Sequence, residues 1–115
     1  MIEKIILDYL TAALNVPVAV ERAETPPPKY VLIERTGGGE VNHVMQATVA
    51  IQTYAQSRYD AAALMQEVID AMHGILTLKS IGSAKLSTFY NYTDTEEKTY
   101  RYQAVYDLVY YREVI

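Results

Sequence analysis

The chain has no cysteine and no tryptophan, and only one phenylalanine among its 115 residues. Disulfide bonds and thiolate metal sites are therefore excluded, and the absence of cysteine fits a reducing compartment. A domain of this length buries about two-thirds of the surface of its unfolded chain, so it needs neither kind of staple to fold. We predict a single domain over residues 1–115, because the length is too short for two ordinary ones.

Clusters of positive charge and long apolar runs are also lacking. The formal net charge is -4, and no basic run is present that would follow a nucleic-acid backbone. No apolar run approaches the roughly 20 residues of a membrane span. The first residues carry acids at Glu3 and Asp8 and lack the basic start of a secretion signal. We expect no membrane partner, no direct nucleic-acid partner and no secretion.

Tyrosine is the one abundant aromatic residue, with 11 copies concentrated between Tyr90 and Tyr111. Its apolar body and polar tip suit half-buried sheet faces and wet interfaces. Aromatic side chains on a sheet can also stack on nucleic-acid bases, usually among basic residues. Only Lys98 and Arg101 are basic in this stretch. The pattern therefore favours core packing and a subunit interface over base stacking.

Two segments have apolar residues at helical spacing. The first predicts a helix over about residues 2–14, which Pro17 helps to stop. The second predicts a helix over about residues 58–73, with Ser57 and Asp60 as a capping box and Gly74 at its end. The apolar stripe of the first helix is Ile2, Ile5, Ile6, Tyr9, Leu10 and Ala13. The stripe of the second is Ala61, Leu64, Met65, Val68, Met72 and Ile75.

Alternation of apolar and polar residues predicts five strands. Their expected ranges are about 16–22, 29–36, 42–55, 81–92 and 99–112. Three prolines, 26–28, form a stiff connector before the second strand. Gly37–Gly39 is interpreted as the flexible turn of a hairpin, and Thr93–Lys98 as the polar turn of another.

The expected order of elements is α-β-β-β-α-β-β. We therefore predict an α+β fold, in which two helices pack on one face of a mostly antiparallel sheet of about five strands.

No motif in the chain predicts catalysis. Gly37–Gly39 lacks the Lys-Ser/Thr of a phosphate loop and is followed by Glu40 and a strand. His73 shares a helix face with Asp70, but two groups do not complete a metal site. The acids of the 93–98 turn lie among polar residues that keep them hydrated. We expect no enzyme activity, no metal and no cofactor.

Element order and composition over about the whole chain resemble a known family, without one diagnostic motif. The similarity lies in the helix Ile2–Leu14, the proline segment leading into Lys29–Glu34, the run from Gly37–Glu40 into Ala47–Ala55, and the helix Tyr59–Met72. The chain resembles the tail terminator and tail-completion proteins of long-tailed bacteriophages, which are also described as minor tail or tail-to-head joining proteins.

This resemblance implies an antiparallel sheet with two helices and a hexameric ring. The ring would cap the growing tail tube and then present a surface to the head connector, so the implied partners are copies of the chain, the tail tube protein and the head connector protein. The implied location is the virion, assembled in the host cytoplasm. Two alternatives stay open: a head-proximal connector or neck protein of the same joint, and a small α+β sandwich that acts as a binding module.

A ring uses heterologous contacts, so each subunit needs two different complementary patches. We expect a poorly held glycine tip that orders on assembly, a polar turn that does likewise, and a tyrosine-rich strand that a neighbour extends. The candidate interaction residues are Gly37, Gly38, Gly39, Glu40, His43, Asp94, Glu96, Glu97, Tyr100 and Tyr102.

Overall fold

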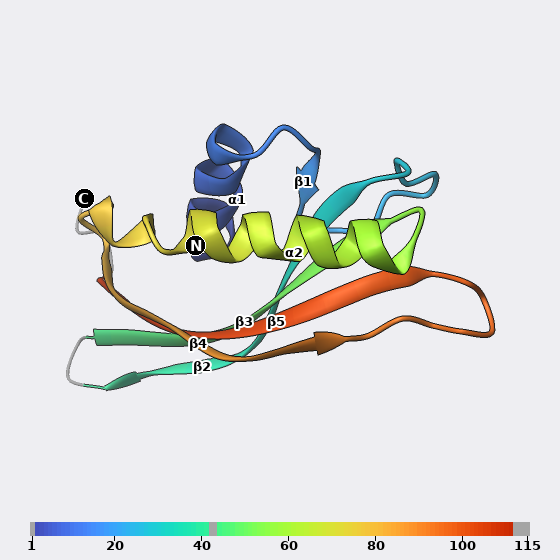
Figure 1. Ribbon diagram of the computed structural model, residues 1–115. Coiled ribbons are helices and arrows are strands. Elements are labelled where there is room, and N and C mark those ends of the chain that lie inside the picture. Colours follow the sequence, from blue (N-terminus) through green and yellow to red (C-terminus); the bar gives the residue numbers. More distant parts are fainter. Residues whose placement is uncertain (1, 42–43, 112–115) are drawn as a thin grey trace.

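The computed structural model describes residues 2–41 and 44–111, and it has the predicted α+β order of elements (Figure 1). The described residues form two helices, five strands and one short 3-10 turn after the second helix. The elements are α1 (Ile2–Ala13), β1 (Val18–Ala19), β2 (Tyr30–Val41), β3 (Val44–Ala55), α2 (Arg58–Met72), η1 (Ile75–Thr77), β4 (Ile81–Asn91) and β5 (Tyr100–Tyr111).

The five strands form one sheet in the order β1-β2-β3-β5-β4. β1 runs parallel to β2, and every other pair is antiparallel. The prediction of a mostly antiparallel sheet is confirmed. The expectation that the tyrosine-rich strand forms an edge is wrong, because β5 pairs with β3 on one side and with β4 on the other.

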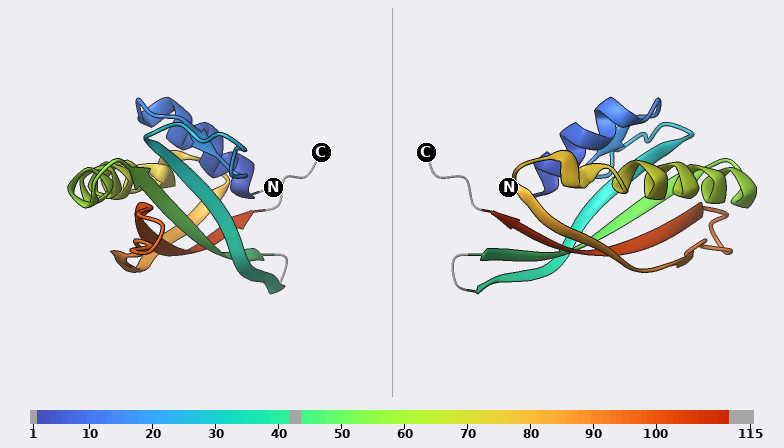
Figure 2. Two further views of the ribbon diagram at one scale, coloured as in Figure 1. Left: turned by 90° about the vertical axis from the view of Figure 1, so that its right-hand side faces the viewer. Right: turned by 60° about the vertical axis from the view of Figure 1, so that its left-hand side comes forward.

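Both helices cover the same face of the sheet, as predicted, and Figure 2 shows them as one layer above the twisted strands. α2 contacts β3 and β5, whereas α1 lies over β2. The buried core between the layers includes Ile6 of α1, Leu64 of α2, and Ile33, Ile51 and Leu108 of the sheet. Full burial of each such side chain contributes about 1.5–3 kcal/mol. Ala13, predicted in the stripe of α1, is exposed.

Different interactions are found at the two ends of α2. At the start, Ser57 Oγ accepts a hydrogen bond of 3.1 Å from the Asp60 N–H, which is the expected cap. At the end, Gly74 does not take the left-handed backbone of a glycine cap, since its φ is -91°. A Cβ at Gly74 would lie 2.6 Å from the hydroxyl oxygen of Tyr9, so any larger residue there would have to displace the Tyr9 side chain of α1.

Two of the sequence predictions for strands and turns need correction. The strand expected over 16–22 is reduced to Val18–Ala19. Gly37–Gly39 is not a turn: these residues continue β2, which reaches Val41 after a bulge between Arg35 and Gly37. The next strand is predicted over 42–55; residues 42 and 43 lie outside the described residues, and β3 covers Val44–Ala55.

The molecule is elongated, with extents of 44 × 26 × 24 Å. The β2–β3 hairpin projects past α1 at one end of the sheet, and the turn between β4 and β5 projects at the other (Figures 1 and 2). Both hairpins that the sequence marked as contact regions therefore lie at the ends of the long axis.

Candidate interaction surfaces

The glycine-rich part of β2 is exposed but held in place. Gly37, Gly38, Gly39 and Glu40 pair with β3 from Thr48 back to Met45. Arg35 Nε donates to the Gly37 carbonyl at 3.1 Å, and Arg35 Nη2 donates to the Gln46 carbonyl at 3.3 Å. The expectation of a poorly held tip is therefore wrong for residues 37–40. His43, also a candidate, lies outside the described residues.

The three glycines have different reasons to be glycine. Gly38 has a φ of 149°, and a Cβ there would lie 2.4 Å from the Gln46 carbonyl oxygen. A Cβ at Gly37 would meet Thr48 at an ordinary contact distance of 3.8 Å. A Cβ at Gly39 would meet nothing within 4 Å. Packing within one copy thus requires a glycine only at position 38.

The turn between β4 and β5 is closed by its own side chain. Asp94 Oδ1 accepts hydrogen bonds from the Glu96 and Glu97 N–H groups, at 3.0 and 3.2 Å. Asp94 and Thr99 also exchange two backbone hydrogen bonds of 3.0 Å. Contrary to the expectation of a turn held only on assembly, hydrogen bonds within one copy close this turn. Glu96 and Glu97 are exposed at its tip, whereas Asp94 is half-buried.

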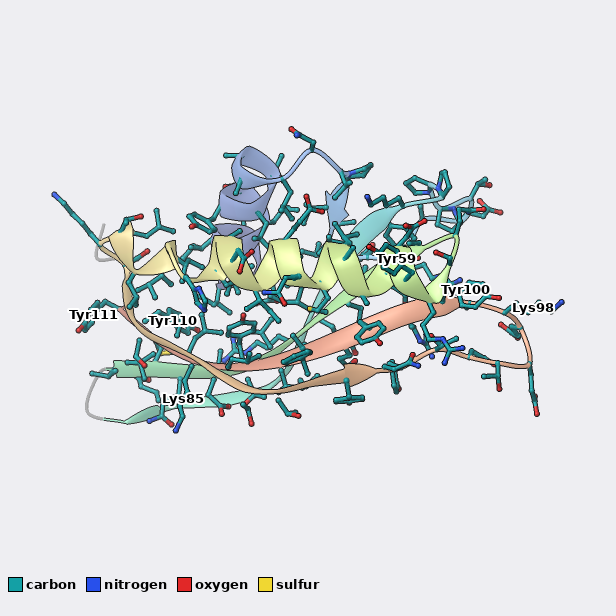
Figure 3. All side chains as sticks on the ribbon, viewed as in Figure 1. Tyr59, Lys85, Lys98, Tyr100, Tyr110 and Tyr111 are labelled. Atoms are coloured by element: carbon teal, nitrogen blue, oxygen red, sulfur yellow. The ribbon has the colours of Figure 1, made fainter. Side chains whose placement is uncertain are left out.

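The two candidate tyrosines of β5 are half-buried. Tyr102 packs against the main core. Tyr100 lines a surface hollow of about 330 Å³ together with polar and basic residues of the turn and of the start of α2. Figure 3 shows Tyr100 and Lys98 at this end of the molecule, with Tyr59 above them on α2. Because β5 is central, these tyrosines offer side-chain contacts only.

The open strand edges lie elsewhere, on β4 and β2. Within residues 2–41 and 44–111, β4 pairs only with β5, so its outer backbone is open along Ile81–Asn91. β2 pairs with β1 only at Val31 and Leu32, which leaves residues 33–41 open on that side. The two edges differ in sequence and in charge. An open edge is a template for strand pairing.

Sequence reasoning did not foresee a polar chain across the sheet face that the helices leave uncovered. The Tyr54 hydroxyl donates to Gln52 Oε1 at 2.7 Å, and Gln52 Nε2 donates to Gln103 Oε1 at 2.7 Å. Gln103 Nε2 then donates to the Tyr90 hydroxyl oxygen at 2.6 Å. The chain links β3, β5 and β4. Its only signal in the sequence is a glutamine in each of two long strands, which face each other once the register is known.

Aromatic and cationic groups extend this chain. Tyr30 stacks on Tyr54 with ring centroids 4.5 Å apart. The Arg101 guanidinium lies 4.4 Å from the ring centre of Tyr92 and donates to the Tyr54 hydroxyl oxygen at 3.3 Å. Burial and the neighbouring Tyr54 raise the pKa of Tyr30, although Arg22 and Arg101 oppose the shift. The basic groups here are therefore engaged with the chain's own tyrosines.

The described residues contain no group of three or more His, Cys, Asp or Glu side chains that could hold a metal ion. Asp70, which sequence spacing placed near His73, accepts a hydrogen bond of 3.1 Å from Gln66 Nε2. Asp70 is exposed on α2, and His73 is exposed at the C-cap of this helix. The helix face that they share is therefore solvated.

Comparison with known proteins leaves the family undecided. No family model matches the chain, and no curated protein matches it significantly. In the part of the chain that the structure describes, both helices are too short or too polar to cross a membrane.

Proposed function

We propose that the chain is a structural protein of a bacteriophage or prophage that forms a ring, terminates the tail tube and joins the tail to the head. The observation that supports this proposal best is the pair of unlike open edges, β4 and residues 33–41 of β2, at opposite margins of one sheet. The resemblance of the sequence to tail terminator proteins supplies the biological setting.

Two unlike edges favour a ring over a simple dimer. A two-fold dimer uses the same patch on both subunits, whereas a ring needs two different patches that complement each other. An edge strand in each patch offers a row of backbone donors and acceptors to the next copy. The proposed assembly is a hexamer, located in the virion.

In this proposal the chain has no catalytic role and no cofactor. Its partners are copies of itself, the tail tube protein below the ring and the head connector protein above it. A connector or neck protein of the same joint would use the same ring and differ only in the partner that it meets first. The two are separated by asking which end of the joint the ring binds.

A small binding module is the proposal from a different class, and one observation favours it. Tyr90 and Tyr92 are partly exposed beside Arg101 on the sheet face that the helices leave open. A ligand that stacks on aromatic rings would use such a face. However, Arg101 already contacts Tyr54 and Tyr92, so a ligand would have to displace internal contacts. The ring is therefore preferred.

The test is the oligomeric state and the binding site on the tail. Native mass spectrometry of the full-length protein, alone and mixed with purified tail tubes, should give a closed hexamer or a ring on tube ends in electron micrographs. A protein that stays monomeric at high concentration and does not bind tube ends would contradict the proposal. A ring that binds isolated head connectors and ignores tubes would favour the connector alternative.

A further inference from the structure

The open stretches of the two edges lie at the same height along the sheet. Residue pairing across the four long strands places Lys85 of β4 level with Gly37 of β2, by way of Asp107 and Thr48. Thr88 of β4 is likewise level with Glu34 of β2. A neighbour could therefore pair edge to edge without sliding along the strands, which suits a closed ring better than a rising helix.

The strand directions also fit. β2 and β5 run in one direction, whereas β3 and β4 run in the other, because each neighbouring pair is antiparallel. When the next copy is related by rotation about an axis roughly along the strands, its β2 has the direction of the first copy's β2. The β4 strand of one copy then meets the next β2 as an antiparallel partner, the geometry already used throughout this sheet.

The glycines give a second, independent indication. Gly37 and Gly39 lie on the open edge, and packing within one copy does not require a glycine at either position. A glycine inside a strand often marks a place where another backbone comes close. At the same height, β4 offers the short run Ser83–Leu86, where its pairing with β5 is free of bulges.

The exposed charges of the two edges are opposite in sign. Lys85 is the only charged residue of β4, and it is exposed. In the open part of β2, Arg35 is bound to carbonyls of its own chain, which leaves the exposed acids Glu34 and Glu40. Beyond this height the neighbour's β1 already occupies the edge of β2 at Leu32, which limits how far β4 can extend.

From these observations we propose that the partner of the β4 edge is the open edge of β2 in a second copy of this chain. Ser83–Phe89 of one copy pairs antiparallel with residues 33–39 of the next, and Lys85 contacts Glu34 diagonally across the seam. This inference rests on the proposed ring and specifies its subunit contact.

Cysteine cross-linking tests this contact directly, because the natural chain has no cysteine. The variants are Glu34→Cys, Thr88→Cys and the double variant; both positions are exposed and level with each other. Oxidation of the double variant should give a ladder of covalent oligomers that ends at the ring. Each single variant should stay uncross-linked, because the seam joins position 34 of one copy to position 88 of the next.

The possible results separate the two proposals. Dimers from Thr88→Cys alone would mean that β4 pairs with β4, which would overturn this seam. A hexamer by native mass spectrometry whose double variant gives no ladder would also overturn the seam, while the ring itself would stand. A monomer that neither cross-links nor binds tube ends would overturn both.

Charge reversal provides the last readout. Lys85→Glu should weaken assembly, and adding Glu34→Lys to the same chain should restore it, since the pair would then attract with opposite signs. A double variant as weak as the single one would argue that the two residues do not meet.

Discussion

The central and the outer strands of the sheet differ in their pairing and in their burial. β3 and β5 are paired on both sides, and most of β3 from Ala47 to Tyr54 is buried. β4 has one buried residue, Ile81, and β2 is exposed from Glu34 to Glu40. The middle of the sheet therefore carries the stability of the fold, whereas its margins are free to make contacts.

The largest expected effect compares leucines on a central and an outer strand. Leu108 of β5 is buried and Leu86 of β4 is only partly buried, and both face the helices. Leu108→Ala should lower the free energy of unfolding by about 2–5 kcal/mol, because it leaves a cavity in the core. Leu86→Ala should cost less than half as much. Urea denaturation of both variants measures the difference, and equal losses would show that the margin is as well packed as the centre.

The second comparison lies within β2, at the glycine that its own copy requires. Gly38→Ala should lower stability by about 1–3 kcal/mol, because a Cβ would meet the Gln46 carbonyl at a φ that side chains rarely adopt. Thermal unfolding at low protein concentration, where assembly does not contribute, measures this loss. Gly39→Ala is the control and should be neutral or slightly stabilising. If Gly38→Ala left stability unchanged, the backbone of this edge would adjust to the added Cβ more easily than we infer.

The polar chain on the open face gives the third comparison. Gln103→Leu should cost about 1–2 kcal/mol, because it leaves the amide of buried Gln52 without its acceptor. Tyr90→Phe removes the outermost link, on β4, and should cost less than about 0.5 kcal/mol because Tyr90 is exposed and water can replace it. Equilibrium unfolding would contradict this gradient if Tyr90→Phe were the costlier change.

The smallest expected effect is a gain. The hydroxyl of Tyr106 is buried and has no hydrogen-bond partner within the described residues. Tyr106→Phe should therefore raise stability by about 1 kcal/mol at neutral pH. Burial also raises the pKa of Tyr106 from 10.0 to about 12, so the neutral phenol is favoured in the folded protein.

The sign of the pH effect follows from that shift. Unfolded tyrosine loses its proton near pH 10, while folded Tyr106 keeps it to about pH 12. The ionisation of Tyr106 therefore leaves the free energy of unfolding unchanged below pH 10, and lowers it as the pH rises from 10 to about 12. Across this pH range, the free energy of unfolding should fall more steeply with pH for the parent protein than for Tyr106→Phe. If the free energy of unfolding changed equally with pH in both proteins, Tyr106 would ionise as easily in the folded state as in the unfolded state.

Local patterns predicted the elements but not their neighbours. The stripe from Ala61 to Met72 gave α2 and its buried face, because helical spacing is a local property. The position of β5 between β3 and β4 is not local: it depends on a long-range pairing that inserts the last strand beside β3. The tyrosine-rich strand was therefore placed wrongly at an edge, and the true edges were missed.

The glycine stretch failed for a different reason. Three consecutive glycines favour a turn by composition, yet backbone pairing with β3 and the hydrogen bonds of Arg35 keep them in a strand. The polar chain from Tyr54 to Tyr90 was also hidden, because its members meet only when the register across three strands is fixed. Of the candidate residues, Gly37–Gly39 lie in the proposed seam, whereas Asp94 closes the turn between β4 and β5.

The bulges on the outer strands limit which strands can pair with the two open edges. β2 is kinked at Thr36 and β4 at Ser87, at neighbouring heights of the same sheet. A straight strand from an unrelated protein can follow either edge for only a few residues before the ladder breaks. Two bulged edges of matching shape can pair over a longer stretch. The bulges that limit pairing with unrelated strands would therefore also favour pairing between copies of this chain.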